Sequence, residues 1–235
     1  MSLFAISDLH LALHPSLNKP MDVFDVVWTD HVDKLESNWR AAITDDDVVV
    51  IPGDISWAID LAQAMPDLQF LDSLPGTKLL LKGNHDYWWA SMAKMRGLFP
   101  SIKFIQYDCF EADDFVVCGT RGWLLPWNKS LDFTAEESEK IYKRELLRLQ
   151  MSLTCGRDIA MKGKKLIAAS HFPPLTPDHY RTDVTALYQQ YGVDEVVYGH
   201  LHGRRTEMAV EGSVDGIVYH LVAFDKLDAM PKKIL

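Results

Sequence analysis

The sequence lacks most of the features that mark membrane proteins, secreted proteins and disulfide-rich proteins. No segment approaches the ~18 uninterrupted apolar residues that a membrane span needs, and the N-terminus has no basic region of the kind that opens a signal peptide. The three cysteines are an odd number and form no Cys-x-x-Cys motif, so neither a disulfide framework nor a thiolate zinc site is indicated. These absences predict a cytoplasmic protein without membrane contact, since a reducing compartment is the simplest setting for unpaired cysteines.

Long basic tracts are also absent. The 235 residues carry a formal net charge of -9, which argues against extended binding of nucleic acid through its phosphates. The acidic balance does not exclude a small phosphorylated substrate, because bound divalent cations would make a site locally positive. Repeats, low-complexity segments and obvious linkers are missing as well, so we expect one domain over residues 1–235.

Short apolar runs alternate with segments of helical periodicity along the chain. The runs that predict buried strands cover residues 3–7, 48–51, 78–82, 102–107, 115–118, 166–169 and 195–198. The segments that predict helices cover residues 28–43, 59–74, 88–99, 134–153 and 184–191, and Pro66 is expected to break or kink the second of them. A hairpin is expected over residues 205–224. This alternation is typical of an α/β fold, and the late strands without intervening helices suggest a second sheet.

The residues best suited to bind metal ions or to catalyse a reaction directly follow predicted strands. They are Asp8, His10, Asp54, Asn84, His171, His200 and His202. Ligand sites of α/β proteins form beyond the carboxyl ends of the strands, so these side chains are expected at one rim.

The set combines two carboxylates, one amide and four imidazoles, and it contains no thiolate. Mixed oxygen and nitrogen ligands suit borderline divalent ions, with manganese, iron and zinc as the leading candidates. Seven ligands are too many for one four-coordinate zinc. They fit two ions that share a bridge, an arrangement that can clamp the attacking and leaving oxygens of a displacement.

Five motifs occur in a fixed order along residues 8–202. They are Asp8-Leu9-His10, Gly53-Asp54, Gly83-Asn84-His85-Asp86, His171 and Gly199-His200-Leu201-His202. This series resembles the calcineurin-like metallophosphoesterase superfamily. The resemblance implies a four-layer αββα sandwich, in which two mixed β-sheets pack face to face and helices flank them.

The resemblance also implies a role for each residue. One metal ion would be held by Asp8, His10, Asp54 and His202, and the other by Asp54, Asn84, His171 and His200. Asp54 would bridge the two ions. The ions would lower the pKa of a bound water, and the resulting hydroxide would attack phosphorus. His85 would bind no metal and would instead contact a phosphoryl oxygen or protonate the leaving oxygen.

One motif departs from the pattern of the serine/threonine protein phosphatases in this superfamily. Those enzymes carry Gly-Asp-x-x-Asp-Arg-Gly, whereas this chain has Trp57 in place of the second Asp, and no Arg follows it. Phosphoprotein phosphatase activity is therefore doubtful. The residue that orients His85 stays open; Asp86 is its neighbour in sequence.

Two further residues are candidates for substrate binding. Arg121 follows a predicted strand in a glycine-flanked loop, where it could grip a phosphate or form a surface ion pair with about equal plausibility. His14 follows the first motif on a loop that could overhang the site.

The sequence therefore predicts a metal-dependent phosphoric ester hydrolase. Its expected substrate is a phosphomonoester or phosphodiester of a small molecule or nucleotide. A phosphoprotein phosphatase and a nuclease are the alternatives within the superfamily. A non-catalytic metal-binding scaffold is the alternative outside enzymes, and it is disfavoured because every ligand and His85 are retained. The substrate, the native metals and the oligomeric state stay open.

Overall fold

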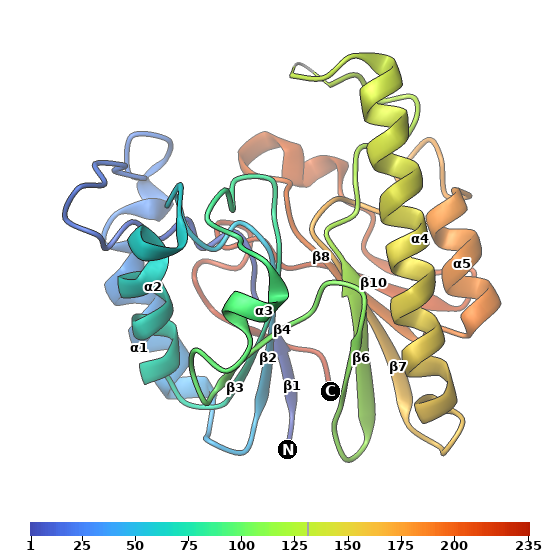
Figure 1. Ribbon diagram of the computed structural model, residues 1–235, viewed down its shortest axis with the longest axis horizontal. Helices are drawn as coiled ribbons and strands as arrows, with labels where there is room; N and C mark the ends of the chain where they lie inside the picture. The colour runs from blue at the N-terminus through green and yellow to red at the C-terminus, as the bar shows by residue number, and fades with distance from the viewer. Residues whose placement is uncertain (131) are drawn as a thin grey trace.

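Runs of aliphatic residues that are apolar on both faces form the central strands. The computed structural model describes residues 1–130 and 132–235, and it contains two sheets packed face to face with helices on the outside (Figure 1). The first sheet has the order β11-β1-β2-β3-β4 and consists of Lys232–Lys233, Leu3–Ala5, Val48–Pro52, Thr77–Leu81 and Ile102–Phe104. The second has the order β5-β6-β7-β8-β10-β9 and consists of Cys109–Glu111, Phe115–Thr120, Lys165–Ser170, Glu195–Tyr198, Ile217–Leu221 and Gly212–Val214. The expected four-layer sandwich is confirmed.

Successive side chains of an inner strand point to opposite faces of the sheet, so each inner strand contributes to two hydrophobic cores. In β2, Val48 and Val50 pack into the layer between the sheets, whereas Val49 and Ile51 pack under the helices of the first sheet. Strands buried on both faces are expected to be apolar throughout, as β2 is.

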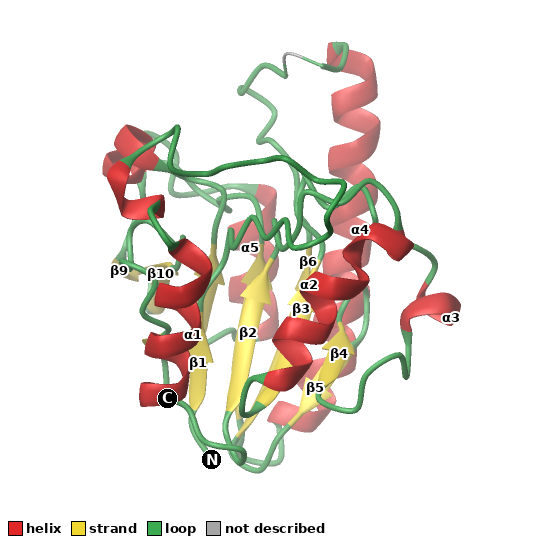
Figure 2. Ribbon diagram, turned by 90° about the vertical axis from the view of Figure 1, so that its left-hand side faces the viewer, coloured by secondary structure: helices red, strands yellow, loops and turns green. Residues whose placement is uncertain are grey.

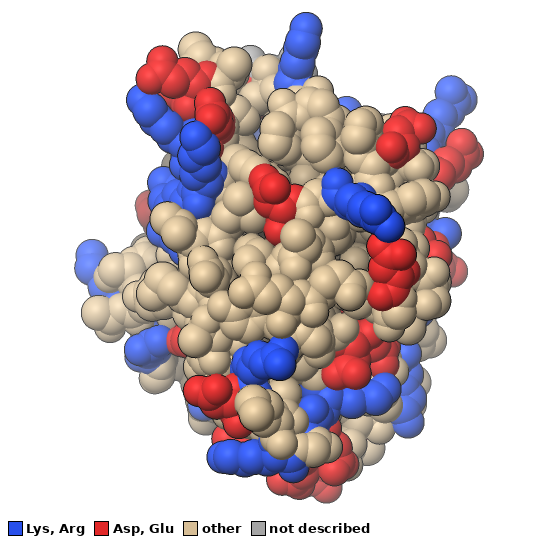
Figure 3. Space-filling view, turned by 90° about the vertical axis from the view of Figure 1, so that its right-hand side faces the viewer, with Lys and Arg blue, Asp and Glu red and all other residues tan. Residues whose placement is uncertain are grey.

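The helices cover the two outer faces. Helices α1 (His31–Ala42) and α2 (Leu61–Ser73) lie over the first sheet, and α4 (Ala135–Ala160) and α5 (Asp183–Tyr191) lie over the second (Figures 1 and 2). The capping box predicted at the start of α4 is confirmed, because Thr134 and Glu137 each accept the other's backbone N–H. On the face that α4 and α5 cover, acidic and basic side chains are interspersed (Figure 3).

Several predicted boundaries were wrong for identifiable reasons. Pro66 does not break α2, since burial of Ala64, Leu68 and Leu71 holds the helix continuous across it. Residues 88–99 form only the short helix α3 (Met92–Met95), because buried hydrogen bonds to Asp86 fix the preceding loop.

Other elements differ in extent. Helix α4 continues seven residues beyond 153, and the pairing of the late hairpin is confined to β9 and β10. Of the expected first helix, Trp28 ends the 3₁₀ turn Val26–Trp28 and α1 begins only at His31, and the 3₁₀ turn Gly203–Met208 replaces the first residues of the expected hairpin. Strands β5 and β11 were not predicted.

The absence of disulfides was also a wrong expectation. Cys109 of β5 and Cys155 of α4 are joined, with Cα atoms 5.9 Å apart and 46 residues between them in sequence. No sequence pattern signals such a pair, because α4 first has to pack on the sheet. Cys118 is free and buried, and burial raises the pKa of its thiol to about 12, which makes it unreactive.

The parallel strands of both sheets deliver their carboxyl ends to one rim, seen at the top of Figure 1. The sheets are joined there by backbone hydrogen bonds, since the Ser7 N–H donates to Val222 O at 2.7 Å and the Phe224 N–H donates to Ser7 O at 3.0 Å. No helix in the described residues is both long enough and apolar enough to cross a membrane.

Candidate metal centre

The loops at this rim turn sharply directly after their strands. Asp8, His10, Asp54 and His200 all adopt left-handed backbone conformations, with φ of 61°, 48°, 52° and 72°. This conformation costs an L-residue roughly 1–2 kcal/mol. Such strain is characteristic of functional sites, where the surrounding structure holds it in place. Here it aims four of the seven predicted ligands into the same space.

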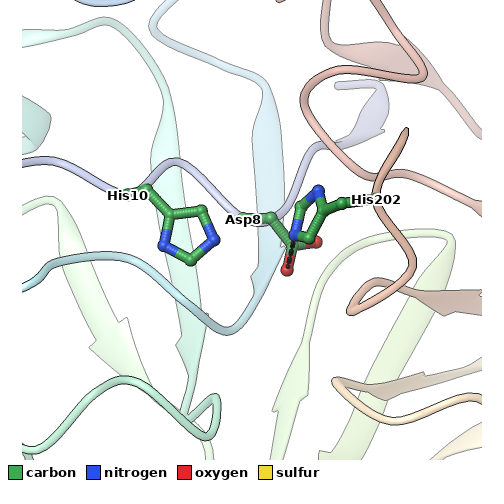
Figure 4. Close-up of side chains that lie close together, drawn as sticks. All are labelled: Asp8, His10 and His202. Atoms are coloured by element: carbon green, nitrogen blue, oxygen red, sulfur yellow. Dashed lines mark ion pairs between the residues drawn. The ribbon is translucent and has the colours of Figure 1, made fainter. Parts of the chain in front are cut away.

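One group of ligands contains Asp8, His10 and His202, which each offer an atom within 4.8 Å of the others. Asp8 Oδ1 lies 3.0 Å from His202 Nε2, and Figure 4 shows these two side chains meeting with the His10 ring alongside. The loops after β1 and β8 supply these residues, so they come from different sheets.

The second group centres on His171, which follows β7. Its Nε2 lies 2.8 Å from Asn84 Oδ1, 3.2 Å from His200 Nδ1 and 3.5 Å from Asp54 Oδ2. The structure thus brings together Asn84, His171 and His200, as the sequence predicted.

Asp54 lies between the two groups. Its Oδ2 is 3.9 Å from His10 Nε2 in one group and 3.5 Å from His171 Nε2 in the other. Its Oδ1 accepts the backbone N–H of His85 at 2.8 Å. Asp8 also reaches both groups, since its Oδ1 lies 3.0 Å from His202 Nε2 and 3.9 Å from His171 Nδ1.

Two glycines let the ligand loops approach one another. A Cβ on Gly83 would collide with the Asp54 carboxylate, and a Cβ on Gly199 would collide with the Asp8 carboxylate. The glycines in the Gly-Asn-His-Asp and Gly-His-x-His motifs are therefore required by close packing around the ligands.

The charge states of the side chains in this cluster favour the binding of a cation. Burial lowers the pKa values of His10 and His200 to about 3, so both rings are neutral at pH 7 and offer a lone pair. Burial raises the pKa of Asp54 well above its usual value, and the nearby Asp8 and Asp86 carboxylates add to that effect. A cation would relieve this repulsion.

His202 differs from the other imidazoles. Burial lowers its pKa, but Asp8 and Asp225 outweigh that effect and raise it to about 10. A proton on the ring here occupies the place between His202 and Asp8 that a metal ion would take. His202 Nε2 and His10 Nδ1 are buried and have no well-aligned hydrogen-bond partner among the described residues.

Hydrogen bonds behind the ligands set the direction of two rings. His171 Nδ1 lies 3.0 Å from Pro52 O, and His202 Nδ1 lies 3.0 Å from Asp225 Oδ1. Such contacts orient ligating imidazoles and raise their basicity. Sequence reasoning missed Asp225, although it directly follows a buried apolar run that ends in Phe224; no motif marks it.

We expect Asp225→Ala to weaken metal binding by roughly 10- to 100-fold. The variant loses the contact to His202 Nδ1 and the Gly203 N–H···Asp225 Oδ2 bond of 2.7 Å. Competition against a chromophoric chelator measures the affinity. Glu207→Ala removes the same charge from an exposed position nearby and is the control. Equal affinities in the two variants would show that Asp225 does not orient the ligand.

Asp86 holds the ligand loops together and makes no hydrogen bond to His85. Its fully buried carboxylate accepts the N–H groups of Ile55 at 2.9 Å, Ser56 at 3.1 Å and Gly83 at 2.7 Å. It also accepts the indole N–H of Trp88 at 2.9 Å. These bonds tie the loop that carries Asp54 to the loop that carries Asn84.

Asp86→Ala should therefore lower the free energy of unfolding by about 3 kcal/mol or more, because it leaves several buried donors unpaired. Asp86→Asn retains the shape and one acceptor oxygen, so its loss should be smaller. Urea unfolding of both variants beside the parent measures the difference. A loss below ~1 kcal/mol for the alanine variant would contradict this role.

His85 lies beside Trp57 instead of an acidic residue. The two ring centroids are 4.7 Å apart, and Trp57 also stacks on His10 at 4.8 Å. Trp57, at the position of the missing acid, thus restricts the His85 ring by packing. Burial lowers the pKa of His85, so its neutral form predominates at pH 7 and can still donate a hydrogen bond through its N–H.

A cavity of about 640 Å³ opens onto the first ligand group. It is lined by the imidazoles of His10, His85 and His202, the aromatic rings of Phe24, Trp28 and Trp57, the cations of Arg205 and Lys226 and the carboxylates of Asp25 and Asp225. This volume is suited to a small-molecule ligand.

The two tentative substrate-binding residues lie elsewhere. His14 is half-buried, with Nδ1 2.9 Å from Ser16 Oγ, and it does not line this cavity. Arg121 lies over the Trp123 ring at 4.6 Å and lines a different cavity. A role for either residue in substrate binding stays a prediction.

Two solved structures of low sequence identity align with this chain over nearly its whole length. The phosphopantetheinyl hydrolase of Mycobacterium tuberculosis aligns with a TM-score of 0.55 and 16% identity, over 100% of this chain and 95% of its own. The protein of unknown function AQ665 of Aquifex aeolicus aligns with a TM-score of 0.49 and 15% identity, over 99% of this chain and 95% of its own. A search of curated proteins found no significant match.

The family comparison covers most of the chain. The model of the calcineurin-like phosphoesterase family matches residues 1–204, which include every predicted ligand. These residues also carry the rim at which the two ligand groups meet. The chain therefore belongs to the calcineurin-like phosphoesterase family.

Proposed function

We propose that the protein is a dinuclear metal-dependent hydrolase of a phosphomonoester or phosphodiester in a small molecule or nucleotide. The observation that carries the proposal is the position of Asp54 between two groups of candidate ligands. Family membership and the hydrolase among the solved structures of this fold support the reaction class.

The residues fit two divalent ions. Asp8, His10, Asp54 and His202 would hold one ion, and Asp54, Asn84, His171 and His200 the other. Manganese, iron or zinc suits this mixture of oxygen and nitrogen ligands. The ions would supply Lewis acidity, which lowers the pKa of water and polarises a phosphoryl oxygen.

The other residues position the substrate. The neutral imidazole of His85 lines the cavity, where its N–H can donate to a phosphoryl oxygen or to the leaving oxygen. Trp57 restricts the His85 ring and excludes water from one side of it. The aromatic rings favour a leaving group with a flat apolar part, and the Arg205 cation favours an anionic part.

Three alternatives are weaker. A protein phosphatase would need the acid that Trp57 replaces. A nuclease that binds extended nucleic acid would need a basic surface, and the net charge of -9 argues against one. A non-catalytic scaffold would not need the arrangement of His85 over the ligand groups.

The test is the hydrolysis of p-nitrophenyl phosphate and bis(p-nitrophenyl) phosphate by the purified protein. We expect chelation to abolish turnover and Mn²⁺ to restore it, and the ratio of the two rates distinguishes monoesterase from diesterase activity. His179→Ala, a change at an exposed histidine, is the control variant. Turnover that survives complete metal removal would refute metal dependence. Two bound ions without turnover of any phosphoester would favour the scaffold.

A cytoplasmic location is the remaining part of the proposal. The Cys109–Cys155 disulfide removes the argument from unpaired cysteines, because disulfides persist mainly in oxidising compartments. Counting free thiols in protein taken rapidly from its native cells tests the location. Three free thiols would support the cytoplasm, and one would contradict it.

A further inference from the structure

A second cavity, of about 230 Å³, lies between the carboxyl ends of β3 and β6. Lys82 directly follows β3, Arg121 directly follows β6, and Arg144 and Arg148 reach the cavity from α4. Glu145 is the only carboxylate among the described residues that line it. The catalytic proposal uses none of these side chains.

Positive charge in this cavity is incompletely neutralised. Glu145 Oε1 lies 2.8 Å from Arg148 Nη1, 3.5 Å from Arg144 Nε and 3.8 Å from Arg121 Nη2. The other Glu145 oxygen accepts the hydroxyl of Thr120 at 2.6 Å. Lys82 has no carboxylate within ion-pair distance in the described chain. One buried carboxylate therefore faces four cations.

Two buried donors in the same cavity have no acceptor. They are Arg121 Nε and the indole Nε1 of Trp89, which lack a hydrogen-bond partner in the part of the chain that the structure describes. Only 16% of the Arg121 side chain is exposed. Buried donors without partners are costly, so an acceptor is expected at this place.

The cavity adjoins the metal centre through the backbone. Arg121 O accepts the N–H of the ligand His171 at 3.0 Å, and Lys82 precedes the Gly83-Asn84 ligand turn. A group bound here would lie beside the second group of metal ligands.

We propose that Lys82, Trp89, Arg121, Arg144 and Arg148 form a binding site for a phosphate-like oxyanion. Its occupant is a second phosphate group of the substrate or free inorganic phosphate. The first source rests on the proposed function and would restrict the substrate to molecules with two anionic groups. An oxyanion supplies acceptors to both unpaired donors and charge to the unpaired cations. A purely structural role for Glu145 in anchoring α4 would use neither Lys82 nor Trp89.

Reductive methylation of the full-length, metal-containing protein tests the site without relying on activity. We expect inorganic phosphate to protect Lys82 from methylation, measured by mass spectrometry, while sodium chloride of equal ionic strength does not. Lys140, an exposed residue of α4, is the internal control and should react equally in both. Equal labelling of Lys82 with and without phosphate would overturn the proposal.

Kinetics identify the source of the oxyanion. Lys82→Gln should lower kcat/KM for adenosine 3′,5′-bisphosphate about tenfold and leave that for adenosine 5′-monophosphate unchanged. Lys140→Gln removes the same charge from the exposed face of α4 and should change neither value.

The outcomes separate this proposal from the proposed function. Protection of Lys82 together with the selective kinetic loss assigns the site to the substrate. Protection without that loss assigns it to free phosphate. Protection in a protein that hydrolyses no phosphoester would refute the proposed function and still establish the oxyanion site.

Discussion

His85→Ala should lower kcat by about 10²-fold or more while both metal ions stay bound. The His85 imidazole belongs to neither ligand group, and its backbone N–H, which donates to Asp54 Oδ1 at 2.8 Å, remains in the variant. The loss therefore reports a contact of the ring with the reacting phosphate. Steady-state kinetics with p-nitrophenyl phosphate and metal analysis of the same sample measure the two quantities.

Trp57→Leu helps to separate the chemistry of His85 from its positioning. The variant retains the imidazole but removes the ring that packs against it at 4.7 Å. We expect a smaller fall in kcat than for His85→Ala. Full activity of His85→Ala would exclude the ring from the reaction, and loss of metal from that variant would show that His85 supports the ligands instead.

Asp54→Asn should lose at least one of the two metal ions and nearly all activity, a fall on the order of 10³-fold or more in kcat/KM. An amide carries no charge and cannot bridge two cations as a carboxylate does. Asparagine is the appropriate replacement because residue 54 has a φ of 52°, and asparagine tolerates left-handed backbone better than alanine. Metal content per chain and kcat/KM are the measurements.

A matched control for Asp54→Asn is Asp46→Asn. It makes the same substitution at an exposed turn residue before β2 and should change neither metal content nor activity. Two retained ions per chain in Asp54→Asn would refute the bridging role, whatever the activity. Circular dichroism of both variants checks that the fold is intact.

The strands and most long helices could be predicted because their signals are local. The apolar run before Asp54 and the capping box at Thr134 depend on neighbouring residues alone. Prediction failed where tertiary contacts overrode the local pattern. The segment after Asp86 has helical spacing, but the Trp88 indole at its start is bonded to that buried carboxylate, and the helix begins only at Met92.

The meeting of the seven candidate ligands at one rim could be predicted for a topological reason. Each follows a strand, and parallel strands place their carboxyl ends at one rim. The residues that hydrogen-bond to the candidate ligands or pack against them could not be predicted. Asp225 supports His202 from 23 positions away in the chain, and no spacing rule connects them. The placement of Trp57 against both His10 and His85 likewise depends on how two loops pack.

Periodicity and motifs at strand ends were therefore enough to predict the fold class, the family and the candidate ligands. Tertiary structure alone decided that Asp54 lies between the two ligand groups and that Cys109 and Cys155 pair. It also decided that Lys82, Trp89 and Arg121 line one cavity. These features depend on distances between segments far apart in the chain, and those distances arise only when the two sheets and α4 pack together.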